Sequence, residues 1–260
     1  MPNASYPSVT DDLELALRLA DEASAIALGY FTRGISAKPK ADGTPVTDAD
    51  LEVERMLSTA LASERPGDAI LGEEFGEAGS ATRRWIIDPI DGTMNFVAGR
   101  PDWGVHIALE DDGDIVVGVV TRPVLETRWW AGRACGAFMG SPTNRGEPTS
   151  LQVSTQESLA DSRVSGWLIE GDPLKDRLRS LPAWVEPLDL DTIMRVAEGR
   201  LEAHLDGTPS QIWDRAPLVV LVEEAGGRYQ DLTGGKNLDL PGGLFTNGRI
   251  DAEIDKFVTS

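Results

Sequence analysis

Two carboxylates three positions apart follow an apolar segment and precede a Gly-Thr pair. Asp88 and Asp91 come after residues 85–87, a pattern that predicts a buried strand followed by a turn that Pro89 fixes. Gly92-Thr93 adds amide and hydroxyl donors of the kind that bind phosphate. Oxygen ligands suit Mg²⁺, Mn²⁺ or Ca²⁺, whereas zinc prefers Cys and His. The segment therefore predicts a site for a hard cation and a phosphate.

Three further segments place acids at the ends of expected elements. They are Thr47-Asp48-Ala49-Asp50, Gly72-Glu73-Glu74 and Trp213-Asp214. Taken singly, each has a structural explanation, because acids commonly begin helices or lie in solvated turns. Asp214 is harder to explain in this way, since it precedes the apolar residues 216–222, where an unpaired charge is costly. A shared metal would relieve that cost.

Composition limits the possible partners. The 260 residues have a formal net charge of −19, which argues against nucleic acid and anionic membranes as partners. In so acidic a chain, binding of a phosphate ester favours bound metal ions over an arginine-lined pocket. No apolar segment approaches the ~20 residues of a membrane helix, and residues 1–12 lack the pattern of a signal peptide. We expect a cytoplasmic protein in which the single Cys135 is inert.

Hydrophobic periodicity predicts the main elements. Helices are expected at residues 12–31, 47–64, 191–198 and 214–225. Strands are expected at 69–72, 85–87 and 202–205, and in an antiparallel meander at 105–109, 115–120 and 126–131. Residues 32–46 are predicted to be a loop, and 161–187 have the weakest pattern, with a short helix at 174–181. This order of elements favours a layered α/β or α+β fold.

The four acidic segments resemble the inositol monophosphatase family of Mg²⁺-dependent, lithium-sensitive phosphatases. The family's first signature is similar to residues 85–96 and its second to residues 213–227, and the similarity covers about 12–140 and 190–248. The resemblance implies one α+β phosphatase domain over residues 1–260, built as a layered α/β/α/β/α sandwich. It further implies a metal and phosphate subdomain at 12–140, a substrate-side subdomain at 150–260, and a homodimer.

The resemblance also assigns metal ligands. Glu73, Asp88 and the Ile90 carbonyl would bind one Mg²⁺ ion, and Asp88, Asp91 and Asp214 would bind a second. A third, looser ion would share Glu73 through water, and Mn²⁺ could replace Mg²⁺. Two or three ions per site are therefore expected.

Catalytic and phosphate-binding roles follow from the same resemblance. Asp50 and Thr93 would orient the attacking water, with Asp48 as the alternative to Asp50. Glu73 would contribute to catalysis as well as to metal binding. Gly92 and Thr93 would hold phosphate oxygens through their backbone amides.

Two segments are similar to the histidinol-phosphate phosphatase branch, which acts in histidine biosynthesis. They are the loop at residues 38–50 and the expected strand 128–131 with its paired tryptophans. In the loop, Lys38 or Lys40 would close over the site as a mobile cation, and an ordinary solvated charge is the alternative. One departure concerns Gly207, because many relatives carry Glu at this position, seven residues before Asp214.

Acids on the expected leaving-group side would bind the substrate, and we expect Asp91, Asp189, Asp206 and Asp214 to do so, with Asp191 beside them. They favour the amine-bearing histidinol phosphate over inositol 1-phosphate or a specialised sugar or cyclitol phosphate, although such acids are often merely solvated. An alternative is that the protein is a non-catalytic homologue with a regulatory or binding function. The complete set of acidic residues argues against this alternative. His106 and His204 are expected to be packing or surface residues.

Overall fold

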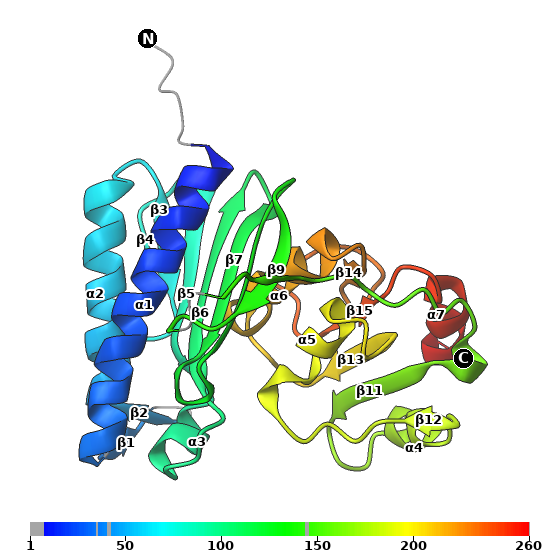
Figure 1. Ribbon diagram of the computed structural model, residues 1–260. Helices are drawn as coiled ribbons and strands as arrows, with labels where there is room; N and C mark the ends of the chain where they lie inside the picture. The colour runs from blue at the N-terminus through cyan, green and yellow to red at the C-terminus, as the bar shows by residue number, and fades with distance from the viewer. Residues whose placement is uncertain (1–7, 35, 41–42, 144–145, 260) are drawn as a thin grey trace.

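The computed structural model describes residues 8–34, 36–40, 43–143 and 146–259, which form five layers (Figure 1). Helices α1 (Val9–Arg33) and α2 (Asp48–Glu64) cover the outer face of the first sheet. Helices α5 (Met194–Ala197) and α6 (Ile212–Glu224) lie between the two sheets. Helices α4 (Pro173–Arg179) and α7 (Asp251–Thr259) cover the far face of the second sheet. The predicted α/β/α/β/α sandwich is confirmed.

The first sheet has eight strands in the order β10-β9-β8-β7-β6-β5-β3-β4. Its pairs are antiparallel except that β3 and β5 are parallel. The strands are β3 (Ala69–Gly72), β4 (Gly76–Ala78), β5 (Arg83–Asp91), β6 (Gly104–Asp111), β7 (Asp114–Arg122), β8 (Thr127–Gly132), β9 (Gly136–Gly140) and β10 (Thr149–Ser150). The predicted antiparallel meander therefore forms β6, β7 and β8.

The second sheet has five strands in the order β12-β11-β13-β15-β14. Strand β11 is parallel to both of its neighbours, and the remaining pairs are antiparallel. The strands are β11 (Arg163–Leu168), β12 (Ala183–Trp184), β13 (Ala203–Gly207), β14 (Arg228–Gln230) and β15 (Gly243–Thr246).

Helix α6 joins the two halves of the sandwich. Nine of its residues are buried, because it packs against β7 of the first sheet on one side and β14 of the second on the other. A helix buried on all sides needs apolar residues all round, and residues 216–222 supply them. The first turn of α6 thus lies between the two sheets, where it can present Asp214 to the first sheet.

The prediction of a turn directly after residue 87 is wrong. Strand β5 continues to Asp91, with Asp88 paired to His106 and Asp91 paired to Gly104. Three steps along β5 therefore match two along β6, which is a β-bulge. The bulge accommodates Pro89, which has no amide hydrogen for a regular ladder. It also changes the direction in which the acidic side chains of this segment point.

Other differences concern short elements. The predicted loop 32–46 contains a hairpin of β1 (Ala37–Pro39) and β2 (Pro45–Thr47), while its residues 35 and 41–42 lie outside the described residues. The weakly patterned 161–187 forms β11, α4 and β12. The predicted helix 191–198 is divided into a 3₁₀ turn, η3 (Leu190–Thr192), and α5. Within the described part of the chain, every helix is too short or too polar to cross a membrane.

Candidate active site

Four carboxylates from three elements come together at the end of β5. The Asp88 side chain interacts with those of Glu73, Asp91 and Asp214. Burial and these neighbouring charges raise the pKa of Asp88 well above its usual range, and Asp88 is only 2% exposed. No Lys or Arg among the described residues forms an ion pair with Asp88. A buried carboxylate surrounded by like charges fits a divalent cation bound by oxygen ligands.

The bulge in β5 gives this segment its local geometry. The Ile90 amide donates a hydrogen bond to Asp88 Oδ1 at 3.0 Å, which fixes the Asp88 side chain. The Ile90 carbonyl accepts a hydrogen bond from the Thr93 hydroxyl at 3.0 Å. The Ile90 carbonyl oxygen thus lies within hydrogen-bonding distance of the Thr93 hydroxyl, and its role as a cation ligand stays a prediction.

Glu54, a residue that the sequence did not indicate, holds the segment that presents Glu73. Its carboxylate accepts hydrogen bonds from the Glu74 and Phe75 amides, both at 2.8 Å. A Cβ atom at Gly72 would lie 2.0 Å from Glu54 Oε1, so only glycine leaves room for this contact. The glycine at position 72 is thus explained by its close approach to a buried acid on α2.

The two loop lysines lie in different surroundings. Lys40 Nζ contacts Glu73 Oε1 at 2.7 Å and Glu74 Oε1 at 2.6 Å. Lys38 is exposed and lies 3.7 Å from Asp48. Of the two, Lys40 is therefore the one that reaches the acidic cluster.

Asp50 lies at the start of α2 and faces Thr93. Its Oδ1 is 3.4 Å from the Thr93 hydroxyl, while Oδ2 accepts a hydrogen bond from the Thr47 amide at 2.8 Å. Burial raises the pKa of Asp50. Asp50 thus forms a capping box with Thr47, which is the structural role expected of an acid at the start of a helix. It also lies close to Thr93, the predicted catalytic threonine.

Gly92 connects β5 to α3 (Thr93–Val97) in the left-handed conformation, at φ +81°. A Cβ atom there would lie 2.6 Å from Leu190 Cδ1 and 3.0 Å from the Asp102 carbonyl. Glycine is therefore required here for both its backbone conformation and its size.

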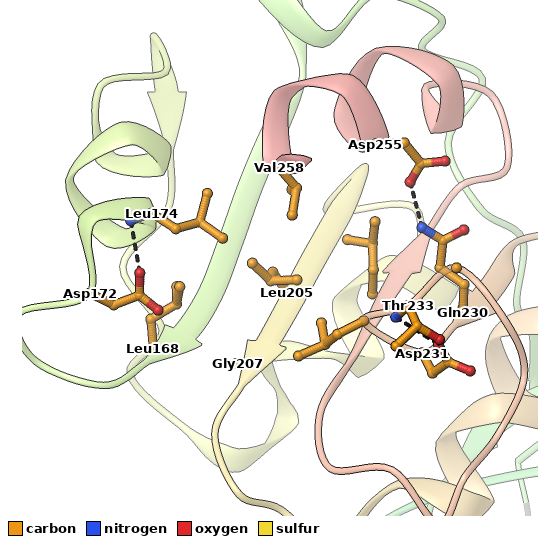
Figure 2. A pocket seen from close by; sticks show the side chains of 13 residues that line it. Leu168, Asp172, Leu174, Leu205, Gly207, Gln230, Asp231, Thr233, Asp255 and Val258 are labelled. Atoms are coloured by element: carbon orange, nitrogen blue, oxygen red, sulfur yellow. Dashed lines mark hydrogen bonds between the residues drawn. The ribbon is translucent and has the colours of Figure 1, made fainter. Parts of the chain in front are cut away.

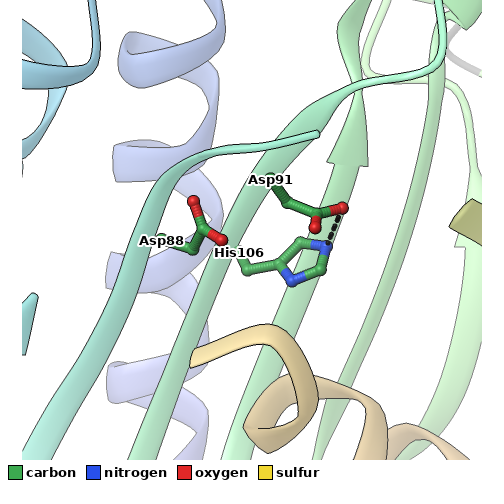
Figure 3. A group of neighbouring side chains, drawn as sticks. All are labelled: Asp88, Asp91 and His106. Carbon is green, nitrogen blue, oxygen red and sulfur yellow. Dashed lines mark ion pairs between the residues drawn. The ribbon is translucent and has the colours of Figure 1, made fainter. Parts of the chain in front are cut away.

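Asp91 has two partners that the sequence did not indicate. Its Oδ2 lies 3.3 Å from His106 Nε2 and 3.1 Å from Arg122 Nη2. Figure 3 shows Asp88, Asp91 and His106 converging, and their potential ligand atoms lie within 4.8 Å of one another. Burial lowers the pKa of His106 to about 4. His106 is buried, as a packing residue would be, but it also belongs to this cluster.

Asp214 lies in the first turn of α6, where its Oδ2 accepts a hydrogen bond from the Gln211 amide at 2.6 Å. Burial, followed by the nearby Asp91 charge, raises the pKa of Asp214 to about 7. A cavity of about 330 Å³ opens beside Asp91 and Asp214, and its wall includes Trp167 and Asp206. This cavity touches the acidic cluster and is large enough for a small leaving group.

The three predicted leaving-group acids differ in their surroundings. Asp206 lines the cavity and accepts hydrogen bonds from the Thr208 amide at 3.0 Å and the Ser210 hydroxyl. Asp189 forms an ion pair with Arg195, and Asp191 pairs with Arg122 at 2.7 Å. Neither Asp189 nor Asp191 is among the residues that line the cavity. Their proposed contact with substrate stays a prediction.

A larger cavity of about 460 Å³ lies on the far face of the second sheet, between α4 and α7 (Figure 2). Its wall includes Leu168 and Leu205, and also Gly207, the position at which the family resemblance led us to expect Glu. A Cβ atom at Gly207 would lie 3.5 Å from Leu168 Cδ2. Because β13 alternates its faces, Asp206 points to the smaller cavity and its neighbour Gly207 does not.

Comparison with known proteins decides the family. The sequence pattern of the inositol monophosphatase family matches residues 9–256. The chain belongs to the inositol monophosphatase family. A protein from Streptomyces griseus named glucose-1-phosphate thymidylyltransferase is 44% identical over 88% of both chains. A histidinol-phosphatase from Mycobacterium tuberculosis is 42% identical over 94% of this chain and 96% of its own.

Solved structures agree with this assignment. An inositol monophosphatase from Zymomonas mobilis matches with a TM-score of 0.82 at 26% identity, over 98% of this chain and 100% of the other. The family match and the histidinol-phosphatase relative indicate a phosphoric monoester hydrolase. Members of the inositol monophosphatase family are generally metal-dependent, and the acidic cluster of this member provides oxygen ligands for a cation.

Proposed function

We propose that this inositol monophosphatase family member hydrolyses a small phosphomonoester with Mg²⁺ held by the acidic cluster. Glu73, Asp88, Asp91, Asp214 and the Ile90 carbonyl would hold two or three ions, and Mn²⁺ could replace Mg²⁺. Support comes from the burial of Asp88 among three other carboxylates without a Lys or Arg partner in the described chain. Hard oxygen ligands of this kind prefer Mg²⁺ or Mn²⁺ to softer metals.

The side chains around the cluster support hydrolysis by water. A bound divalent cation would lower the pKa of a water molecule and neutralise charge on the phosphoryl oxygens. Asp50, whose pKa is raised by burial, would orient this water with Thr93 and accept its proton. The Gly92 and Thr93 amides would hold phosphate oxygens. Glu73 would keep its place through the contacts of Glu54 with the next two amides.

We propose histidinol phosphate as the substrate. The observation that favours it is the cavity beside Asp91 and Asp214, whose lining includes both Trp167 and Asp206. An imidazole ring can stack on an indole, and a protonated amine can pair with a carboxylate. The 42% identical histidinol-phosphatase of M. tuberculosis supports the same substrate.

A sugar or cyclitol phosphate is the second candidate. The 44% identical S. griseus relative is named for a reaction on glucose 1-phosphate. The Thr208 and Ser210 side chains, which also line the cavity, offer hydroxyl groups that can bind a polyol. Inositol monophosphate, the substrate class in the name of the Z. mobilis neighbour, belongs to this group.

Release of phosphate from a substrate panel tests the proposal. The purified chain with Mg²⁺ is assayed with histidinol phosphate, inositol 1-phosphate and glucose 1-phosphate, and with p-nitrophenyl phosphate as a substrate without a specific leaving group. Glucose 1-phosphate is also tested with dTTP, which separates hydrolysis from nucleotidyl transfer. We expect the highest kcat/KM for histidinol phosphate. A clear preference for a polyol ester would contradict this order, and pyrophosphate release from dTTP would contradict the hydrolase itself.

A Trp167→Leu variant sharpens the test. We expect kcat/KM for histidinol phosphate to fall by roughly 2- to 12-fold, since stacking contributes roughly 0.5–1.5 kcal/mol beyond buried area. Turnover of p-nitrophenyl phosphate by this variant is the control. An equal decrease in kcat/KM for both substrates would show that Trp167 supports the fold of the cavity and does not determine substrate choice.

Several features of the sequence-based account stay predictions. They are the homodimer, the cytoplasmic location, lithium inhibition and the division near residues 140–150. Strand β10 (Thr149–Ser150) still pairs with β9, so any division would follow it. The remaining alternative is that this family member has lost its catalytic activity and has a regulatory function. Release of phosphate from any ester would exclude this alternative.

A further inference from the structure

Arg122, at the end of β7, is a buried cation beside the acidic cluster. It is 1% exposed. Its Nη2 lies 3.1 Å from Asp91 Oδ2, and its Nε donates a hydrogen bond to Asp191 Oδ1 at 2.7 Å. Its Nη1 donates to the Thr121 carbonyl at 3.2 Å and lies 3.3 Å from His106 Nε2. Every nitrogen of the guanidinium therefore has a partner.

The structure around Arg122 leaves it little freedom. A Cβ atom at Gly104 would lie 2.3 Å from Arg122 Nη1, so a larger residue there would displace the guanidinium. Its two carboxylate partners come from β5 in the first sheet and from η3 in the connection to α5. Arg122 thus ties the predicted metal ligand Asp91 to a segment about 100 residues further along the chain.

These contacts give the two carboxylate oxygens of Asp91 different surroundings. Oδ2 lies against both Arg122 and His106. Oδ1 has no hydrogen bond or ion pair with any of the residues that the structure describes, and Figure 3 shows the Asp91 carboxylate turned with one oxygen toward His106. A carboxylate held in this way offers a cation one free oxygen.

We propose that Arg122 is a positioning residue that holds the Asp91 carboxylate in the orientation that turnover requires, at a cost in cation affinity, and that Asp191 reduces this cost. The inference rests on the proposed metal dependence. Arg122 repels a cation bound to Asp91, since both are positive and bulk water is excluded from the guanidinium. Asp191 neutralises part of the Arg122 charge and reduces this repulsion. Arg122 and Asp191 therefore act on cation affinity with opposite signs.

The test compares two variants by direct titration with Mn²⁺, in which the electron paramagnetic resonance signal of free Mn²⁺ reports binding without turnover. Substitution of a residue that holds a metal ligand typically lowers metal affinity or activity by about 10–100-fold, whereas removal of a cation that repels the metal should raise the affinity. In Arg122→Met we expect Mn²⁺ to bind about tenfold more tightly, while kcat falls because Asp91 is no longer held. In Asp191→Asn we expect binding about tenfold weaker, because less of the Arg122 charge is then neutralised.

Two controls separate charge from geometry. Arg122→Lys keeps the charge but not the planar fork, so kcat should fall with Mn²⁺ affinity within about threefold of the wild type. Arg128→Met removes a cation that pairs with Asp21 on the α1 side, and Mn²⁺ affinity should not change.

The outcomes distinguish this inference from the proposed function. A wild type that binds no Mn²⁺ would overturn both. A wild type that binds Mn²⁺, with Arg122→Met and Asp191→Asn shifted in the same direction or not at all, would overturn only the role of Arg122. If Arg122→Met does not fold, Asp191→Asn decides the matter, because Asn has nearly the shape of Asp and can still accept the Arg122 Nε hydrogen bond.

Discussion

Removal of one charge from the acidic cluster is expected to stabilise the metal-free protein and to abolish its stabilisation by Mg²⁺. Asp88→Asn is the sharpest such change, because Asp88 is 2% exposed and interacts with three other carboxylates. Asn keeps the shape of the side chain and can still accept the hydrogen bond of the Ile90 amide at Oδ1. The fold should therefore survive.

The size of the stabilisation expected for Asp88→Asn follows from the distances between the carboxylates. Potential ligand atoms of Asp88 and Asp91 lie within 4.8 Å of each other. Two negative charges at this distance repel by about 3 kcal/mol at an effective dielectric constant of about 20. Proton uptake by the cluster relieves part of this repulsion at low pH. We therefore expect the metal-free Asp88→Asn protein to be more stable than the metal-free wild type, by an amount that approaches this value only in alkaline solution.

The stability of the metal-free protein should decrease as the pH rises. The pKa of Asp88 is raised in the folded protein, and that of Asp214 is raised from 3.8 to about 7. Between the ordinary and the raised values the folded state binds more protons than the unfolded state, so stability falls as pH rises through this window. For Asp214 the loss should be complete a little above pH 7. Asp88→Asn should lose less stability over the same range.

Thermal unfolding followed by circular dichroism measures both effects. In EDTA, the wild-type Tm should fall between pH 5 and pH 8 more than that of Asp88→Asn. At 100 times its Kd, a ligand contributes about 2.7 kcal/mol. For a chain of 260 residues, this corresponds to a rise in Tm of roughly 5–10 °C. Asp88→Asn should show almost none of this rise.

An exposed acid supplies the control for this prediction. Asp239→Asn removes the same charge from a surface position and should behave as the wild type. The reasoning would be refuted by an Asp88→Asn protein that is less stable than the wild type at pH 8 without metal. A full Mg²⁺-induced rise in the Tm of Asp88→Asn would refute the metal assignment.

Three further substitutions test other parts of the site. Asp50→Asn should lower kcat by ~10²–10⁴-fold with Mn²⁺ affinity retained, as kinetics and Mn²⁺ titration would show; weaker Mn²⁺ binding with normal kcat would make Asp50 a ligand. Gly92→Ala should cost roughly 1–2 kcal/mol or more in stability, since φ is +81° and its Cβ would meet Leu190; an unchanged Tm would argue against this strain. Lys40→Met should lower the Mg²⁺ concentration at half-maximal rate, because Lys40 occupies Glu73; an unchanged value would show that this contact does not compete with metal.

Much of the fold could be predicted from local pattern. The long helices α1, α2 and α6 and the strands β6, β7 and β8 have clear periodicity, and their positions were confirmed to within a few residues. The strands that were missed are β1, β2, β4, β9, β10, β11, β12, β14 and β15. Most of them have only two to four residues, which carry too little pattern, and their pairing depends on distant partners. The five-layer arrangement came from the family resemblance rather than from periodicity.

The site was predicted unevenly for a similar reason. The acids Glu73, Asp88, Asp91 and Asp214 belong to short motifs, and the structure brings them together. Glu54, His106 and Arg122 could not be found in this way, since each reaches the cluster from a strand or helix whose register is set by tertiary pairing. The bulge in β5 was also missed, although Pro89 within an apolar strand was a local signal for it.

The central claim is that the acidic cluster binds a divalent cation that hydrolysis of a phosphomonoester requires. The most direct test measures phosphate release from histidinol phosphate and p-nitrophenyl phosphate by the wild type and Asp88→Asn, first in EDTA and then with Mg²⁺ restored. The account predicts release only by the wild type and only with Mg²⁺. Undiminished release in EDTA, or near-normal release by a folded Asp88→Asn protein, would contradict it.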